Sequence, residues 1–168
     1  ECHNKGMTTF LVTNGTTPEV LEKLDPLPTQ LYVSLIAPNE EIYKKLGNPL
    51  IPYGWEKLQQ TLDLLPSLDT RTVIRHTLVN NWNLDDTFIP DYARMIKRSN
   101  PDFVEPKGYV FVGQSRQRMT IKNMPTHDQI KQFSSLLSDE LSYPITNEKS
   151  DSRVVLLSSG KKPDRIVK

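Results

Sequence analysis

Apolar positions along the chain form two alternating patterns: short continuous runs, and longer stripes with helical spacing. The continuous runs are rich in β-branched and aromatic residues, and they predict strands at 8–15, 30–37, 71–79, 103–113 and 152–159. The helical stripes fill the intervals and predict helices at 18–21, 40–46, 55–65, 91–99 and 127–141. Strands that alternate with helices in this way indicate βαβ units with a parallel sheet.

Polar residues at the carboxyl ends of three apolar runs are the first candidate site residues, because active sites and ligand sites of parallel sheets lie at the carboxyl ends of the strands. Asn14 with Gly15 has the pattern of a strand-ending turn, and its amide could alternatively meet a ligand. Ser34 needs a hydrogen-bond partner, from the backbone or a ligand. Arg75 is costly to bury unless it pairs with a carboxylate such as Glu105 or with an anionic ligand. The residues alone leave these alternatives open.

A basic segment follows the fourth run. Pro106 interrupts that run, so we expect it at an edge, a bend or a bulge. The segment 107–122 has a local charge of +4 and interleaved aromatic residues, from Lys107, Tyr109, Phe111, Arg116, Arg118 and Lys122. This composition suits phosphate contacts with stacking on an unstacked RNA base, and it equally suits a solvated basic loop.

Composition narrows the function classes. The chain has 168 residues and a net charge of +1, which allows one domain or a piece of a larger protein and excludes a uniformly basic coat. Its single cysteine, Cys2, cannot form a disulfide or a self-contained iron-sulfur site. His76 is expected on the strand face opposite Arg75, as a packing residue. We therefore predict no catalytic or metal-binding residue here. No apolar run is long enough for a membrane span, so we predict a cytoplasmic protein.

Several strings together resemble one enzyme family. They are FLVTNGT, QLYVSLIAPNEE, WEKLQQTLDLL, RTVIRHTLV, and KGYVFVG with the SR, R, T, NMP and H that follow it. In order and spacing, from about residue 5 to residue 157, they are similar to the C-terminal half of the archaeal type of tRNA 4-demethylwyosine synthases, which are radical S-adenosylmethionine enzymes. Since the chain begins with Glu1 rather than Met, we expect a fragment.

The resemblance implies an α/β fold, a partial TIM-type (βα) barrel that is the C-terminal half of a radical S-adenosylmethionine fold with a wyosine-forming extension. The implied division is 1–100 for the barrel part, 101–160 for the wyosine-base-formation region and 161–168 for a basic tail. The implied reaction joins carbons of pyruvate to N1-methylguanosine at position 37 of tRNA(Phe). It implies S-adenosylmethionine and a [4Fe-4S] cluster in the complete enzyme, with the cluster ligands in a missing N-terminal half.

The resemblance also implies site residues. Asn14, Ser34 and Arg75 would bind S-adenosylmethionine, and tRNA would contact Lys107, Ser115, Arg116, Arg118 and Asn123. The chain departs from the family's usual strings at Ile36, where an acid is usual, and at His76, Asn80, Asn81 and Pro106. An alternative function is a noncatalytic tRNA-binding remnant that has lost the cluster-bearing half. A radical enzyme of related fold with another substrate is a third.

Overall fold

The computed structural model describes residues 1–163 and 166, so the basic tail expected at 161–168 lies partly outside the described residues. Within them, six strands form one sheet in the order β1-β2-β3-β4-β6-β5. The strands are β1 (Phe10–Thr13), β2 (Gln30–Ser34), β3 (Arg71–Leu78), β4 (Phe103–Gly108), β5 (Ile145–Lys149) and β6 (Val154–Ser158). β1 to β4 are parallel, whereas β6 is antiparallel to both β4 and β5. The predicted parallel sheet is confirmed for four strands and wrong for the last predicted strand.

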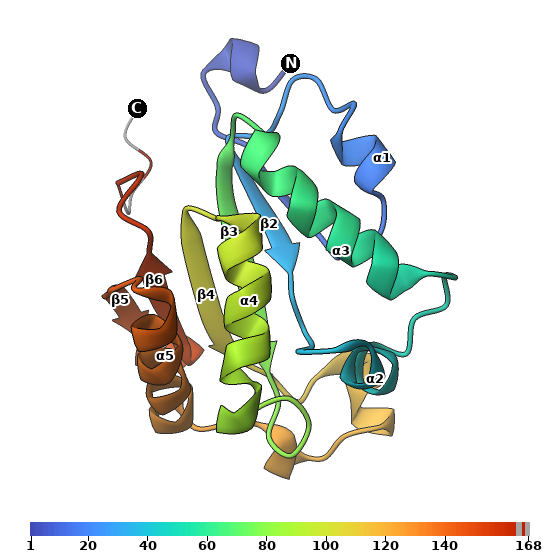
Figure 1. Ribbon diagram of the computed structural model, residues 1–168, viewed down its shortest axis with the longest axis vertical. Helices are drawn as coiled ribbons and strands as arrows, with labels where there is room; N and C mark the ends of the chain where they lie inside the picture. Colours follow the sequence, from blue (N-terminus) through green and yellow to red (C-terminus); the bar gives the residue numbers. More distant parts are fainter. Residues whose placement is uncertain (164–165, 167–168) are drawn as a thin grey trace.

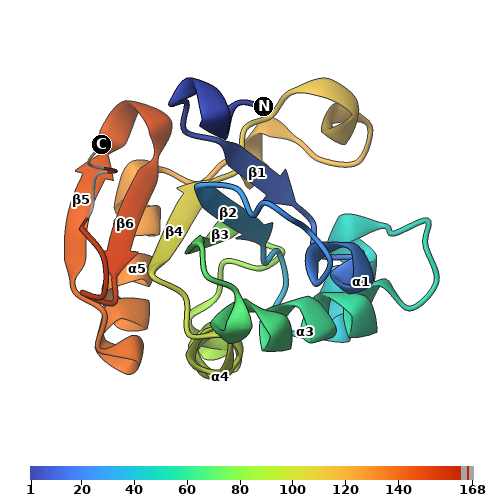
Figure 2. The ribbon, with the colours of Figure 1, turned by 90° about the horizontal axis from the view of Figure 1, so that it is seen from above.

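Helices pack on one face of this sheet. They are α1 (Pro18–Leu21), α2 (Glu40–Ile42), α3 (Gly54–Leu64), α4 (Ile89–Ser99) and α5 (His127–Leu141). A π-helical turn, η2 (Tyr43–Gly47), continues α2. Viewed along the sheet, α3, α4 and α5 lie side by side on the same side of the strands (Figure 2). The predicted helices are therefore confirmed.

The core lies between the sheet and these helices. Val33, Ile74, Val104 and Leu157 are register partners across four neighbouring strands, and each is fully buried. Apolar side chains of the helices cover this row, namely Leu58, Leu62, Tyr92, Ile96, Ile130, Phe133 and Leu137. The inward-facing residues of the strands, which alternate with a period of two, therefore pack against the apolar stripes of the helices in one hydrophobic layer.

The opposite face of the sheet has no helix over it among the described residues (Figure 2). Phe10 and Val12 of the edge strand β1 point to this face and are 57% and 54% exposed. Tyr32, the register partner of Val12, is half-buried on the same face. An exposed apolar strip along an unpaired edge strand is a surface that normally packs against another part of a protein.

The fourth predicted strand ends earlier than expected. β4 stops at Gly108, and the predicted residues 109–113 leave the sheet. The physical reason is that both neighbouring strands end at this point. Gly108 pairs with Leu78, the last residue of β3. Lys107 pairs with Val154, the first residue of β6. The chain then forms an irregular segment, residues 109–124, with two short 3-10 turns.

Pro106 does not mark a strand edge or a bulge. It lies inside β4, which is paired on both sides, and the register with β6 is the same at Val104–Leu157 and at Lys107–Val154. The pairings between Val104 and Lys107 are to β3, where Pro106 lies opposite His76. The expectation of an edge or a bulge was therefore wrong.

Candidate functional site

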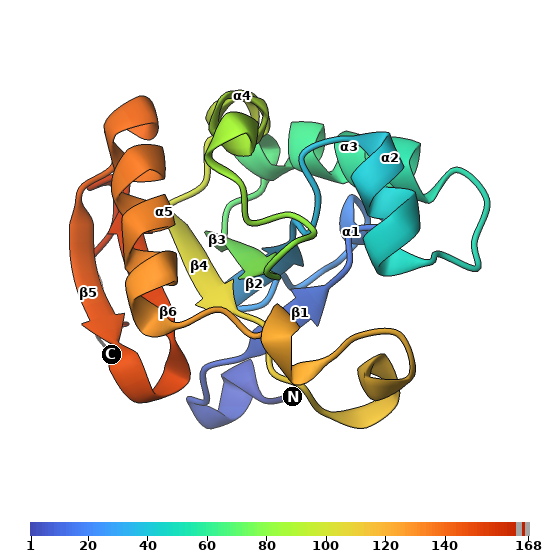
Figure 3. The same ribbon diagram turned by 90° about the horizontal axis from the view of Figure 1, so that it is seen from below.

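The carboxyl ends of the parallel strands gather at one edge of the molecule. β2 and β4 point to the lower edge in Figure 1, where α2 and the 109–124 segment lie, and both termini lie at the opposite end. Figure 3 looks onto this edge and shows the 109–124 segment beside the strand ends. In open α/β sheets this is the edge where ligands bind.

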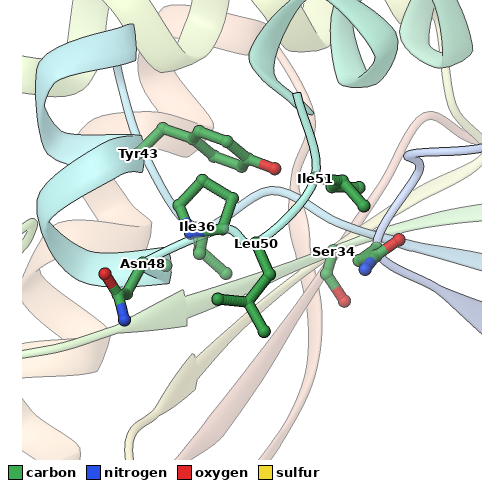
Figure 4. Close-up of a pocket in the computed structure, with 9 residues that line it drawn as sticks. Ser34, Ile36, Tyr43, Asn48, Leu50 and Ile51 are labelled. Carbon is green, nitrogen blue, oxygen red and sulfur yellow. The ribbon is translucent and has the colours of Figure 1, made fainter. Parts of the chain in front are cut away.

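A cavity of about 360 Å³ opens at this edge. It is lined by Asn14, Ser34, Ile36, Tyr43, Gly47, Asn48, Pro49, Leu50 and Ile51. We call it the strand-end pocket. Tyr43 comes from η2, and Leu50 and Ile51 come from the loop that joins η2 to α3 and approach Ser34 from the other side (Figure 4). We call residues 48–53 the 48–53 loop. Two predicted cofactor residues, Asn14 and Ser34, are thus brought together.

Asn14 takes part in a turn and also lines the pocket. Its Oδ1 accepts hydrogen bonds from the Thr16 N–H at 3.2 Å and from the Thr16 hydroxyl at 2.7 Å. Gly15 follows with φ of 73°, and a Cβ there would lie 2.8 Å from a Leu58 side-chain carbon. Glycine is therefore required on two counts. The Asn14 Nδ2 makes no hydrogen bond to the described residues, so it can donate to a ligand.

Ser34 has an unused hydroxyl. Among the described residues no group hydrogen-bonds to it, although the side chain is half-buried at the pocket. Two residues further on, Ile36 lines the same pocket, at the position where the resemblance led us to expect an acid. The wall therefore presents one hydroxyl and one amide, and an apolar group where a carboxylate was expected.

Arg75 does not line this pocket. Its Nε donates to Glu105 Oε1 at 3.0 Å, and its guanidinium lies 4.5 Å from the centroid of the Tyr32 ring. The side chains of the pair are 30% and 15% exposed on the uncovered face of the sheet. Burial, together with the charge of Glu105, raises the pKa of the Tyr32 hydroxyl. The sequence left two partners open for Arg75, a carboxylate such as Glu105 or an anionic ligand. The structure shows Arg75 paired with Glu105.

His76 faces the helices, as predicted. It is fully buried, its ring lies 3.9 Å from that of Tyr92 and 5.4 Å from that of Phe133, and neither ring nitrogen finds a hydrogen-bond partner within the described part of the chain. Burial lowers the pKa of the imidazole to about 3. It is therefore a neutral packing residue, as expected.

The predicted tRNA contacts divide into two groups, and the first consists of Arg116, which is exposed, and Ser115 and Lys107, which are half-buried. Arg116 is exposed, with Nε donating to the Phe111 carbonyl at 3.2 Å. Ser115 shares a 2.6 Å hydrogen bond with the Tyr109 hydroxyl. Lys107 is half-buried in β4. Arg116 is the most accessible cation of this group.

The second group is engaged within the protein. The Arg118 guanidinium donates to the carbonyls of Leu46, at 3.3 Å, and of Lys45, in the last turn of η2. Such carbonyls lack helical partners, and a cation there also opposes the negative end of the turn. Asn123 is buried, accepts from the Thr120 N–H at 2.8 Å and donates to the Asn80 carbonyl at 2.9 Å. These contacts hold the 109–124 segment against η2 and the end of β3.

The sequence reasoning missed the outer wall of the strand-end pocket. Tyr43, Leu50 and Ile51 were read as helix or left unassigned, yet all three line it. The available signal was the string NPLIP, in which two prolines flank an apolar pair outside any periodic element. Leu50 is 98% exposed, which no core role explains.

Neither a metal cluster nor a membrane span is found among the described residues. Across residues 1–163 and 166, no group of three or more His, Cys, Asp and Glu side chains could hold a metal ion. Over the same residues, no helix is both long and apolar enough to cross a bilayer.

Comparisons with known proteins agree on one family. Residues 98–159 match the family model described as wyosine base formation. The chain is 49% identical over 161 residues to the S-adenosyl-L-methionine-dependent tRNA 4-demethylwyosine synthase of Pyrococcus abyssi, covering 94% of this chain and 46% of that protein. The chain thus spans about half the length of such relatives.

Solved structures give the same result for the fold. The structure of TYW1 with a lysine-pyruvate adduct bound has a TM-score of 0.82 and 35% identity, over 95% of this chain and 50% of that one. A radical SAM methyltransferase from Sphaerobacter thermophilus has a TM-score of 0.55 at 17% identity, over 81% of this chain and 40% of that one, which is a likeness of fold alone. By these similarities the chain matches, in sequence and in fold, a C-terminal part of tRNA 4-demethylwyosine synthases.

Proposed function

We propose that the chain serves as the C-terminal part of a tRNA 4-demethylwyosine synthase, in wyosine (wybutosine) biosynthesis. The reaction would join carbons of pyruvate to N1-methylguanosine at position 37 of tRNA(Phe). The observation that carries this proposal is the 49% identity to the Pyrococcus abyssi synthase over 94% of the chain. Pyruvate as a substrate has support from the lysine-pyruvate adduct in the related TYW1 structure.

The fold supports a partial TIM-type barrel completed by another half. Four parallel strands carry helices on one side, and the other side exposes Phe10 and Val12 on the unpaired edge strand β1. In a closed or partly closed barrel this face would turn inward and β1 would pair with a further strand. The natural occupant is the N-terminal half of the same enzyme, since relatives are about twice as long. Under this proposal residues 1–100 form barrel wall and 101–160 the wyosine-base-formation region.

The strand-end pocket fits S-adenosylmethionine in part. Asn14 offers its Nδ2 and Ser34 its hydroxyl, and these groups can bond ribose hydroxyls or the methionine portion. Arg75 would reach a carboxylate of the cosubstrate only by exchanging its bond to Glu105. In the complete enzyme, Asn14 and Ser34 would hold the cosubstrate, which would supply radical chemistry once it is cleaved with an electron from the cluster.

The [4Fe-4S] cluster does not fit this chain. Its ligands are cysteine thiolates, and Cys2 is the only cysteine. We therefore assign the cluster to the other half of the enzyme and infer that these 168 residues alone would not catalyse the reaction. Their share is to bind, orient and exclude water at the strand-end edge.

The 109–124 segment supplies the proposed tRNA contacts. Arg116, and Lys107 at the end of β4, remain candidates for phosphate positioning. The Ser115 hydroxyl donates its proton to the Val112 carbonyl and is bonded to the Tyr109 hydroxyl, so it would reach a phosphate only by giving up the bond to Val112. Arg118 and Asn123 contribute by holding the segment in place. The proposal therefore gives Arg116 the principal electrostatic contact.

Equilibrium binding of tRNA(Phe) to this chain at several salt concentrations tests the RNA role. Changing Arg116 to Ala should weaken binding. It should also make the negative slope of the logarithm of the association constant against the logarithm of the salt concentration shallower by about 0.9, which corresponds to one lost phosphate contact. Lys97→Ala, a matched loss of one exposed cation on helix α4, should leave the slope unchanged. An identical slope for Arg116→Ala and the unmodified protein would remove Arg116 from the interface.

A noncatalytic tRNA-binding remnant is the second candidate. The apolar Ile36 in the strand-end pocket, where the family usually has an acid, favours it. Calorimetric titration with S-adenosylmethionine separates the two, in a complex of this chain with the cluster-bearing half of a relative. Binding that is lost in Ser34→Ala supports the synthase, and a complex that binds tRNA but no S-adenosylmethionine supports the remnant.

A further inference from the structure

A second cavity, of about 500 Å³, lies on the other side of the 48–53 loop and has no part in the site described so far. Its lining contains three aromatic side chains, Tyr43, Tyr53 and Trp55, with Lys44, Glu40 and Glu56 at the rim. We call it the aromatic cavity. It shares Tyr43 and the 48–53 loop with the strand-end pocket, so the two cavities have a common wall.

The rings are held apart by the local backbone. Tyr43 and Trp55 have centroids 5.6 Å apart and planes tilted by 52°, so neither ring covers the other completely. A Cβ on Gly54 would lie 2.7 Å from the Tyr43 hydroxyl, so only glycine lets this ring pack so closely. Tyr43 is buried in the core, whereas Trp55 is half-buried and Tyr53 is 74% exposed, so the rings that a flat guest can reach are those of Tyr53 and Trp55.

Tyr53 is the most unusual of the three residues. It is 74% exposed and adopts φ of 57°, in the left-handed region that a bulky side chain rarely enters. Proline precedes it at position 52 and Gly54 follows it at the start of α3. Neither burial nor backbone preference explains a tyrosine here, whereas a ring that must project beside a cavity does.

Polar groups converge on the same space. Lys44 forms an ion pair with Glu40. Glu56 lines the cavity together with Tyr43, and burial, with the charge of Glu56, raises the pKa of the Tyr43 hydroxyl. Carboxylates accept hydrogen bonds from exocyclic amino groups, and the ammonium and hydroxyl groups can donate to ring nitrogens or carbonyls. Open aromatic faces with both donors and acceptors at their edges suit a planar heterocycle.

The cavity also lies beside the basic segment. Arg118 donates to the carbonyls of Lys45 and Leu46, so the 109–124 segment rests on the same turn that carries Tyr43 and Lys44. A nucleotide whose phosphate met the cations of the segment would have its base within reach of the aromatic cavity. RNA loops are recognised in this way, through unstacked bases on aromatic side chains.

We propose that the aromatic cavity binds one unstacked nucleobase of the RNA substrate, stacked on Tyr53 and Trp55 and bonded at its edge by Glu56 and Lys44. A base with an exocyclic amino group, which can donate to the carboxylate, is preferred over uracil. This inference rests on the proposed tRNA role and adds a base-binding site to it.

The test uses the whole chain with Trp82→Phe, which leaves Trp55 as the only tryptophan. The probe is a 17-nucleotide anticodon stem-loop RNA of tRNA(Phe), and the signals are its affinity and the quenching of Trp55 fluorescence. Tyr53→Asn removes the ring and keeps the backbone conformation, because Asn tolerates positive φ. It should bind the RNA about five- to one-hundred-fold more weakly, with less quenching and an unchanged salt slope.

Tyr53→Phe keeps the ring and should retain the affinity and the quenching. Adenosine, cytidine and uridine monophosphates are titrated separately into the Trp82→Phe protein. Each should quench the fluorescence of Trp55, and uridine monophosphate should give the weakest quenching. Equal RNA affinity and quenching for Tyr53→Asn and the chain with Tyr53 would overturn the base site and leave the proposed tRNA role intact. Failure of the unmodified chain to bind the stem-loop contradicts the tRNA role and the base site together.

Discussion

At the scale of single residues, His76 is the side chain most at odds with its surroundings. It is fully buried next to Tyr92 and Phe133, and neither imidazole nitrogen is satisfied within the described residues. A buried polar group without a hydrogen bond costs about 1–3 kcal/mol. A leucine at this position would fill a similar volume with no polar atoms.

His76→Leu should therefore raise the free energy of unfolding by about 1–3 kcal/mol at pH 7, measured by urea denaturation. The folded protein holds the pKa of His76 at about 3, against an ordinary value of 6.5, so only the unfolded chain takes up this proton between those values. Stability should fall as pH decreases from about 6.5 towards 3, by up to about 1.4 kcal/mol per pH unit from this residue.

The His76→Leu protein should lose this part of the pH dependence. His3→Gln is the control, because His3 is exposed. Parallel stability-pH curves for His76→Leu and the unmodified protein would show that the imidazole is not held neutral by burial.

The ion pair of Arg75 gives a second prediction at this scale. Glu105→Gln removes the charge that compensates a partly buried guanidinium and should lower the free energy of unfolding by about 1–2 kcal/mol. Glu140→Gln breaks an exposed pair with Lys97 and should cost less than about 0.5 kcal/mol. Urea denaturation measures both, and equal effects would mean that the Arg75 pair behaves as a surface pair.

At the scale of elements, the helices and the first three strands follow from periodicity alone. The apolar stripe of residues 127–141 and the continuous apolar run of residues 71–79 are buried in the structure. Their patterns therefore predicted both the type of element and the face that it buries. β5 escaped prediction because all five of its residues are exposed and polar positions dominate it. The direction of β6 escaped because it depends on the hairpin with β5 rather than on its own pattern.

The site was predictable where it depends on strand ends, and not where it depends on loops. Asn14 and Ser34 meet because parallel strands end at one edge. The bond of Arg118 to η2 spans more than seventy residues of sequence, and no periodic pattern reports such a contact. Its basic character suggested a phosphate ligand, and the structure adds that two of its five N–H groups donate to backbone carbonyls of η2.

Arg118 should therefore control the order of the turn that precedes the 48–53 loop. Arg118→Ala is expected to speed amide hydrogen exchange across residues 46–51 several-fold, because η2 loses the partner of its last carbonyls. Arg116→Ala, two residues away and bonded only to Phe111 within the described chain, should leave those amides unchanged. Equal exchange in the two variants would contradict the contact.

At the scale of the whole molecule, the uncovered face of the sheet, the strand-end pocket and the aromatic cavity are all consistent with a chain that packs against a second half of an enzyme. The sheet carries helices on one side, and among the described residues β1 is unpaired at its outer edge and Phe10 is exposed, as we propose for half of a larger barrel; the strand-end edge lies beside the 109–124 segment. The chain spans about half the length of its relatives, which supports this proposal. We therefore expect catalysis only when the cluster-bearing half is present.

A chimera tests this central claim most directly. The 161 matched residues would replace their counterparts in the Pyrococcus abyssi synthase, and the reconstituted protein would be given S-adenosylmethionine, a reductant, pyruvate and tRNA(Phe) with N1-methylguanosine at position 37. Mass spectrometry of the digested RNA should show 4-demethylwyosine, and the double change Asn14→Ala and Ser34→Ala should abolish it. A chimera that folds, holds its cluster and binds tRNA, yet leaves N1-methylguanosine unchanged, would contradict the account.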